Sequence, residues 1–254
     1  MRCLVRGRQP ASNPTIGPTH DKKKSKSFIR YNGAVISLGD AMLLDLDAFR
    51  ATPLTTDPYP HLVVPGFLAP SAVNAAIHDF PQLKMPGLFL PEAAEYGPAF
   101  GRLLEEMESP ELRQTVGEKL GLDLTDRPTL VTVRSRCQER DGRIHADSKF
   151  KLATLLLYLN EPWEADGGRL RILRSGEDIE DYAAEVPPAG GTLVCFKVQA
   201  DSWHGHKPFL GTRRYIMVNY CQDAAVRDSE AARHRLSGQV KKLGRVFGLG
   251  TATA

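Results

Sequence analysis

The spacing of apolar residues in the first half of this chain differs from that in the second half. Between residues 71 and 80 they recur at helical intervals, and the charged segments 98–108 and 110–120 repeat that spacing. Ser109 is a good N-cap residue, and Gly121 is typical of a helix end. The pattern therefore predicts three helices before the middle of the chain.

Later in the chain, short apolar and β-branched runs follow one another, separated by DG, DGG and PPAGG turn sequences. Two further runs, Met42–Leu46 and Leu62–Val64, precede the helices and are expected as strands. Roughly seven or eight strands at such spacing are typical of a sandwich or a jelly roll. Helices ahead of them would brace one outer face, so the expected fold class is α+β, mainly β. The later runs are LVTVRSR, KLATLLLYLN, GRLRIL, GTLVCF and RRYIMVNYC.

A chain of 254 residues has the length of one ordinary domain. We expect this domain to span 31–237, with a barrel core at about 128–221. Residues 1–30 form a basic extension expected to be disordered, because the segment is polar and charged. The C-terminal part is expected to be helical to about His234 and to end in a loose tail, 238–254.

The net charge of +3 owes much to the first thirty residues, and no equally basic stretch recurs. A solvated tail is favoured there over a nucleic-acid contact, so nucleic acid is not expected as a partner. The four cysteines form no CxxC pair, which predicts reduced thiols rather than a zinc knuckle or a disulfide framework. No apolar run has the length of a signal peptide or a membrane helix, so we expect a cytoplasmic protein without a membrane partner.

The pair His145 and Asp147 carries the strongest chemical signal. In an extended segment, residues two apart point to the same side, so an imidazole and a carboxylate can close on one ion. His204, from a distant segment, can complete the set. Two imidazoles and one carboxylate on one face of an octahedron are the arrangement of non-haem Fe(II) oxygenases, which leaves positions open for chemistry.

Residues 130–221 resemble the Fe(II)- and 2-oxoglutarate-dependent oxygenase superfamily, most closely its prolyl-4-hydroxylase-like branch. The resemblance lies in IHADSKFKLATLLLYLN, GGRLRIL, GGTLVCF and SWHGHKPFLGTRRYIMVNY, and in the HxD…H…R order. It implies a double-stranded β-helix, which is a cupin-like jelly roll, with Fe(II) held by His145, Asp147 and His204. It also implies 2-oxoglutarate and O₂ as co-substrates, hydroxylation of a substrate C–H bond, and release of succinate and CO₂.

The far carboxylate of 2-oxoglutarate needs a cation deeper in the barrel, and Arg213 is the candidate. A guanidinium matches a carboxylate in a bidentate way and stays charged at every relevant pH. Tyr158 and Thr154 share one face of their predicted strand, so both hydroxyls are expected to point at that same carboxylate. The Tyr-Leu-Asn segment is similar to the family's equivalent strand.

Two choices stay open in the sequence. His206 lies two residues beyond His204 and could be the third ligand instead, although the spacing to Arg213 favours His204. Arg214 adjoins Arg213, but only one of two neighbours on a strand can enter the barrel. Further candidates for contacts around the ligands or the substrate are His206, Asn219, Trp203 and Arg143.

Two other functions compete with a hydroxylase. One is a cupin-like metalloenzyme that does not use 2-oxoglutarate, and the other is a non-catalytic barrel that binds a protein or a sugar. A buried carboxylate clamp at Arg213 and Tyr158 would argue against the first, and an intact ligand set against the second. The substrate is not specified by the sequence, and both peptidyl proline and a small metabolite are open.

Overall fold

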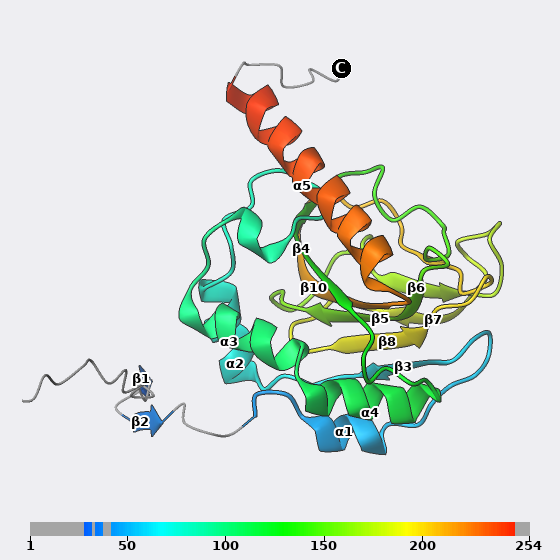
Figure 1. Ribbon diagram of the computed structural model, residues 1–254, viewed down its shortest axis with the longest axis horizontal. Helices are drawn as coiled ribbons and strands as arrows, with labels where there is room; N and C mark the ends of the chain where they lie inside the picture. The colour runs from blue at the N-terminus through cyan, green and yellow to red at the C-terminus, as the bar shows by residue number, and fades with distance from the viewer. Residues whose placement is uncertain (1–27, 32–33, 38–41, 247–254) are drawn as a thin grey trace, which may run out of the picture. The chain divides into compact units, whose positions relative to one another are not determined.

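The computed structural model describes residues 28–31, 34–37 and 42–246 (Figure 1). The chain divides into two compact units, residues 1–41 and 42–254, which are described separately. Among the described residues, none of the helices combines the length and the apolar character that a membrane span requires. The predicted limits of a single domain at residues 31 and 237 stay predictions.

The first unit contains two short strands, β1 (Phe28–Tyr31) and β2 (Ala34–Ser37), which pair antiparallel. The boundary expected after residue 30 falls inside β1. Residues 1–27 of the expected disordered extension lie outside the described residues.

The second unit holds the three helices that the apolar spacing predicts, now with defined limits. Ser109 caps the third of them through its hydroxyl, which accepts a hydrogen bond from the backbone N–H of Leu112 at 3.2 Å. Gly121 ends that helix at a φ of +63°, a conformation that favours glycine. The helices are α1 (Leu46–Ala51), α2 (Pro70–His78), the 3₁₀ turn η1 (Pro91–Ala93), α3 (Pro98–Met107), α4 (Pro110–Leu120) and α5 (Ala224–Val246).

Two antiparallel sheets form the body of this unit (Figure 1). The larger has the strand order β3-β8-β5-β10-β4 and the smaller the order β7-β6-β9. Neighbouring strands in the larger sheet come from distant parts of the sequence, as a jelly roll requires. The strands are β3 (His61–Val64), β4 (Thr129–Cys137), β5 (Lys151–Tyr158), β6 (Leu170–Leu173), β7 (Tyr182–Val186), β8 (Leu193–Lys197), β9 (His204–Gly205) and β10 (Gly211–Cys221).

The larger sheet is buried on both faces. On the outer face, Leu155, Ile216 and Val218 pack against the helices in one apolar core. On the inner face, Leu156 and Tyr215 pack against the small sheet in a second core. Alternate residues of β10 therefore serve two layers, which explains why apolar residues occupy both sides of that strand.

The run Met42–Leu46 is not the strand that we predicted from its apolar residues. Leu44 makes only an isolated bridge to Leu68, and α1 begins at Leu46. The cause is Asp45, whose carboxylate accepts a hydrogen bond from the backbone N–H of Ala48 at 2.8 Å. Such a cap starts a helix in the middle of the apolar run.

The C-terminal helix is longer than predicted, because α5 continues past His234 to Val246. Its second half contains Gln, Lys and Leu but also Gly238 and Gly244, and it has no proline that would end the helix. Residues 238–246 of the expected loose tail are therefore helical, and 247–254 lie outside the described residues. Strand β7, with the weakly patterned sequence YAAEV, is a further element that the apolar runs did not reveal.

Candidate metal centre and co-substrate pocket

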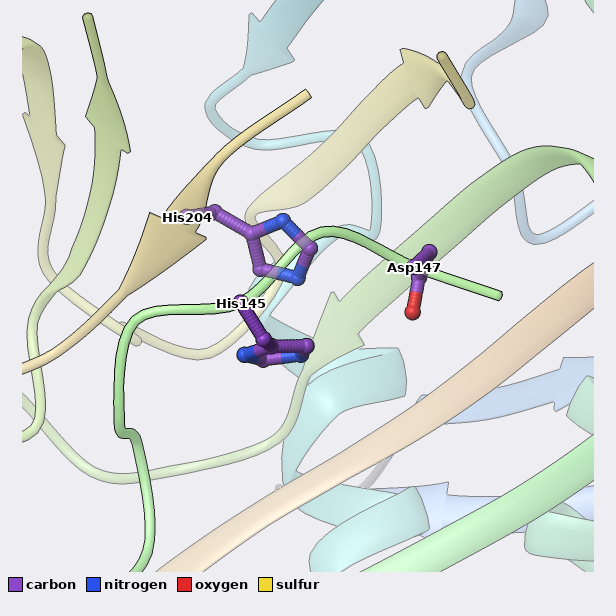
Figure 2. A group of neighbouring side chains, drawn as sticks. All are labelled: His145, Asp147 and His204. Carbon is purple, nitrogen blue, oxygen red and sulfur yellow. The ribbon is translucent and has the colours of Figure 1, made fainter. Parts of the chain in front are cut away.

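His145, Asp147 and His204 meet in one cluster although they come from two distant segments (Figure 2). One ligand atom from each lies within 4.8 Å of those of the other two. The two histidines form an antiparallel bridge, in which each backbone N–H donates to the carbonyl of the other at 2.9–3.0 Å. This long-range pairing places the imidazole rings 4.3 Å apart between centroids.

Backbone carbonyls fix which nitrogen each imidazole presents. Nδ1 of His145 lies 2.8 Å from the carbonyl of Arg143, and Nδ1 of His204 lies 2.9 Å from that of Ser202. A carbonyl only accepts, so in both rings Nδ1 carries the proton and donates. The Nε2 lone pairs are thus left for a metal. A metal-binding histidine usually donates its other ring N–H to a carbonyl or carboxylate, as both rings do here.

The charges in the cluster suit a divalent cation. Burial, with a smaller contribution from His145, lowers the pKa of His204 to about 4, so its imidazole is neutral at pH 7. Burial alone would raise the pKa of Asp147, but the ammonium charge of Lys151 and the hydrogen bonds from Lys151 and Thr154 act against it, and that pKa lies below its ordinary value. An anionic carboxylate and the neutral imidazole of His204 are therefore available together. These residues fit a first-row metal such as Fe(II), with further coordination positions open.

Thr154 does not have the role that we predicted from its strand face. Its hydroxyl lies 2.6 Å from Oδ2 of Asp147, so it contacts a candidate metal ligand rather than the Arg213 end of the barrel. Lys151 holds the other oxygen of the same carboxylate, with Nζ 2.7 Å from Oδ1. We did not predict this contact from the sequence, although the interval of four residues from Asp147 was visible there.

Asn219 extends this contact by one residue, because its side-chain amide lies 2.9 Å from the Thr154 hydroxyl. A hydroxyl has one proton, and Thr154 donates it to Asp147, which is the shorter of its two contacts. The structure places Oδ1 of Asn219 against this hydroxyl, and turning the amide would bring Nδ2 there as a donor instead. That orientation also gives a partner to the Nδ2 atom, which is otherwise buried without one among the described residues.

Arg213 is buried at the other side of a cavity of about 250 Å³ that also reaches the His-Asp-His cluster. Its Nε donates to the carbonyl of Gly168 at 2.7 Å, and its Nη2 donates to the Tyr158 hydroxyl at 3.2 Å. Burial raises the pKa of Tyr158 to about 12, so this phenol keeps its proton. Among the described residues, no carboxylate forms an ion pair with Arg213, whose charge faces the cavity uncompensated.

The remaining candidates occupy different surroundings. His206 lines the cavity but lies outside the cluster, with Nδ1 2.8 Å from the carbonyl of Lys207. Arg214 leaves the barrel, and its guanidinium lies over the ring of Phe80. The Trp203 ring packs close to Gly176. Arg143 has an exposed side chain, and only its carbonyl touches the cluster.

Residues 135–222 match the family model of the 2OG-Fe(II) oxygenase superfamily. The predicted resemblance is confirmed for this segment. With it, the double-stranded β-helix fold class is confirmed, and so is the expected enzyme class, a 2-oxoglutarate-dependent Fe(II) oxygenase. The expected cofactors, Fe(II), 2-oxoglutarate and O₂, are those of this class.

Several solved structures of low sequence identity are also similar to this chain. A Pseudomonas putida prolyl-4-hydroxylase is 21% identical, with 70% of this chain and 93% of that chain covered and a TM-score of 0.47. A viral collagen prolyl hydroxylase from Paramecium Bursaria Chlorella virus-1 is 16% identical, with 67% and 99% covered and a TM-score of 0.47. HygX from Streptomyces hygroscopicus, solved with nickel and 2-oxoglutarate, is 16% identical, with 63% and 81% covered and a TM-score of 0.43. The search of curated proteins gave no match.

Proposed function

We propose that this protein hydroxylates a C–H bond of a peptidyl proline or a small metabolite, with Fe(II) bound by His145, Asp147 and His204. In the overall reaction, 2-oxoglutarate, O₂ and the substrate C–H bond become succinate, CO₂ and a C–OH group. One oxygen atom enters succinate and the other enters the product. When bound, Fe(II) supplies the redox chemistry that couples these two oxidations.

The observation that carries the proposal is the unpaired guanidinium of Arg213. A buried cation without a counter-ion is costly, so the cavity is suited to a ligand that brings a carboxylate. Within the described part of the chain, the two terminal nitrogens of Arg213 keep N–H groups without partners, and the neutral Tyr158 hydroxyl beside them has a proton to donate. A dicarboxylate could then bind Arg213 with one end and the metal with the other.

The protein's own residues position the reactants and exclude water. Asp147 is held by Lys151 and Thr154, and the histidines are oriented through their Nδ1 protons. Leu156 and Leu170 contribute apolar walls to the cavity between the cluster and Arg213. Such walls shield the Arg213 end of the cavity from bulk water, whereas His145 at the metal cluster is exposed.

The residues that line the cavity argue against both a cupin-like metalloenzyme without 2-oxoglutarate and a non-catalytic barrel. A metalloenzyme that does not use 2-oxoglutarate has no need of a buried guanidinium that faces the metal cluster. A non-catalytic barrel has no need of two imidazoles that are both held through Nδ1 and share one cluster with a carboxylate. The hydroxylase uses both features.

The test is the affinity for 2-oxoglutarate of the Mn(II)-loaded protein, measured by calorimetry under argon. We expect Arg213→Ala to weaken binding about 30-fold or more, because the loss of one partner of a buried charge pair costs roughly 2–5 kcal/mol. Mn(II) binding itself should be unchanged. Arg214→Ala is the matched control, since this neighbouring side chain lies outside the barrel, and it should bind 2-oxoglutarate like the wild type.

Equal affinities of the wild type and Arg213→Ala would reject the co-substrate pocket. For the substrate, the rate of succinate release under air is compared with a proline-rich peptide and with free amino acids. A rate that is stimulated by one class and accompanied by a mass increase of one oxygen atom in that compound would identify it. Stimulation without the added oxygen atom would contradict the hydroxylase proposal.

A further inference from the structure

Lys151 places a cation directly on a carboxylate that the proposed function assigns to a metal. Its Nζ lies 2.7 Å from Oδ1 of Asp147, and the two side chains are only 11% and 8% exposed. The contact is built into the backbone, because Lys151 N–H donates to the carbonyl of Ser148 at 2.9 Å in the turn that follows Asp147. The same residue begins β5 and lines the cavity.

A charged lysine and a divalent metal compete for the same carboxylate. An oxygen ligand lies about 2 Å from a first-row metal, which would bring the ammonium to within roughly 5 Å of it. At that separation two positive charges in a partly buried site repel each other strongly. Thr154 holds the other oxygen of Asp147 through an uncharged hydroxyl, and it brings no such repulsion.

We propose that Lys151 is the resident cation of the metal-free centre and sets its metal affinity. Without metal, the ammonium compensates the buried Asp147 carboxylate and holds it in place. When metal binds, it takes over that carboxylate and the ammonium remains as a nearby like charge, so Lys151 keeps the centre stable when empty and weakens metal binding. Thr154 has the opposite effect on affinity, because it orients the ligand without adding charge. This inference rests on the proposed metal site.

The test compares Mn(II) affinities of the full-length protein by calorimetry. Lys151→Met should bind Mn(II) about tenfold more tightly than the wild type, because it removes the like charge. Lys151→Arg, which keeps the charge, should stay within about threefold of the wild type. Thr154→Val should bind about tenfold more weakly, as expected when a group that orients a metal ligand is lost.

Thermal unfolding gives a second readout. A purely structural role of Lys151 would lower the melting temperature, but it would not enlarge the rise that Mn(II) produces. Metal-free Lys151→Met should melt below the wild type, because Asp147 loses its counter-ion, and saturating Mn(II) should raise its melting temperature by more than that of the wild type. Equal or weaker Mn(II) binding by Lys151→Met would overturn the proposal. Failure of the metal site itself would look different, because His145→Ala would then bind Mn(II) like the wild type, and that outcome rejects the proposed function as well.

Discussion

The positions of individual side chains in the candidate metal centre depend on contacts with residues both near and far in the sequence. His145, Asp147, His204 and Arg213 could be chosen from the sequence because their types and order match one chemistry. Lys151 could not, since its contact depends on how the chain turns between Asp147 and β5. Thr154 was assigned to the wrong carboxylate for the same reason: a strand face gives a direction but not a partner.

Two buried histidines should make the stability of the metal-free protein depend on pH. The pKa of His204 and that of His206 are both lowered from 6.5 to about 4, in each case mainly by burial. Above pH 6.5 both are neutral in the folded and unfolded chains, and no penalty arises. Between pH 6.5 and about 4 only the unfolded chain takes up these protons, so stability falls with pH by up to about 3 kcal/mol for each histidine.

Urea unfolding of the metal-free protein at about pH 7 and about pH 4.5 measures this loss. His206→Phe should reduce the loss, whereas a variant of the exposed His78, His78→Gln, should leave it as in the wild type. A free energy of unfolding that is the same at both pH values would show that these imidazoles are not held neutral.

Whole helices and strands were predictable where a boundary signal coincided with the apolar spacing. Helix α4 is the clearest case, because Ser109 and Gly121 mark both ends and the structure uses both. The run Met42–Leu46 failed because the capping residue Asp45 lies inside it and turns its second half into α1. Strand β7 is not predicted, because its sequence YAAEV contains small and charged residues and shows no clear alternation of apolar and polar positions.

Removal of the α4 cap should lower stability without touching the metal centre. Ser109→Ala loses the acceptor for the Leu112 N–H, which should lower the free energy of unfolding by about 1 kcal/mol. Glu118→Ala, an exposed change on the same helix, should cost much less. Chemical denaturation measures both, and the Mn(II) affinity of both variants should equal that of the wild type. An unaffected Ser109→Ala would contradict the importance of this cap.

For the molecule as a whole, the decisive arrangement is the meeting of distant segments. The bridge between His145 and His204 joins two parts of the chain that no local pattern connects, and the resemblance to a known superfamily supplied that link in advance. The helices against one face of the large sheet and the small sheet against the other leave the cavity between the cluster and Arg213. The fold thus brings a metal-binding face and a buried guanidinium to one cavity.

The most direct test of this arrangement is the visible spectrum of the protein with Fe(II) and 2-oxoglutarate in the absence of oxygen. A metal-to-ligand charge-transfer band requires both to bind at one centre. We predict the band in the wild type and in Arg214→Ala, and its loss in His145→Ala, Asp147→Ala and His204→Ala. Absence of the band in the wild type, or its persistence in His204→Ala with loss in His206→Ala, would contradict the account.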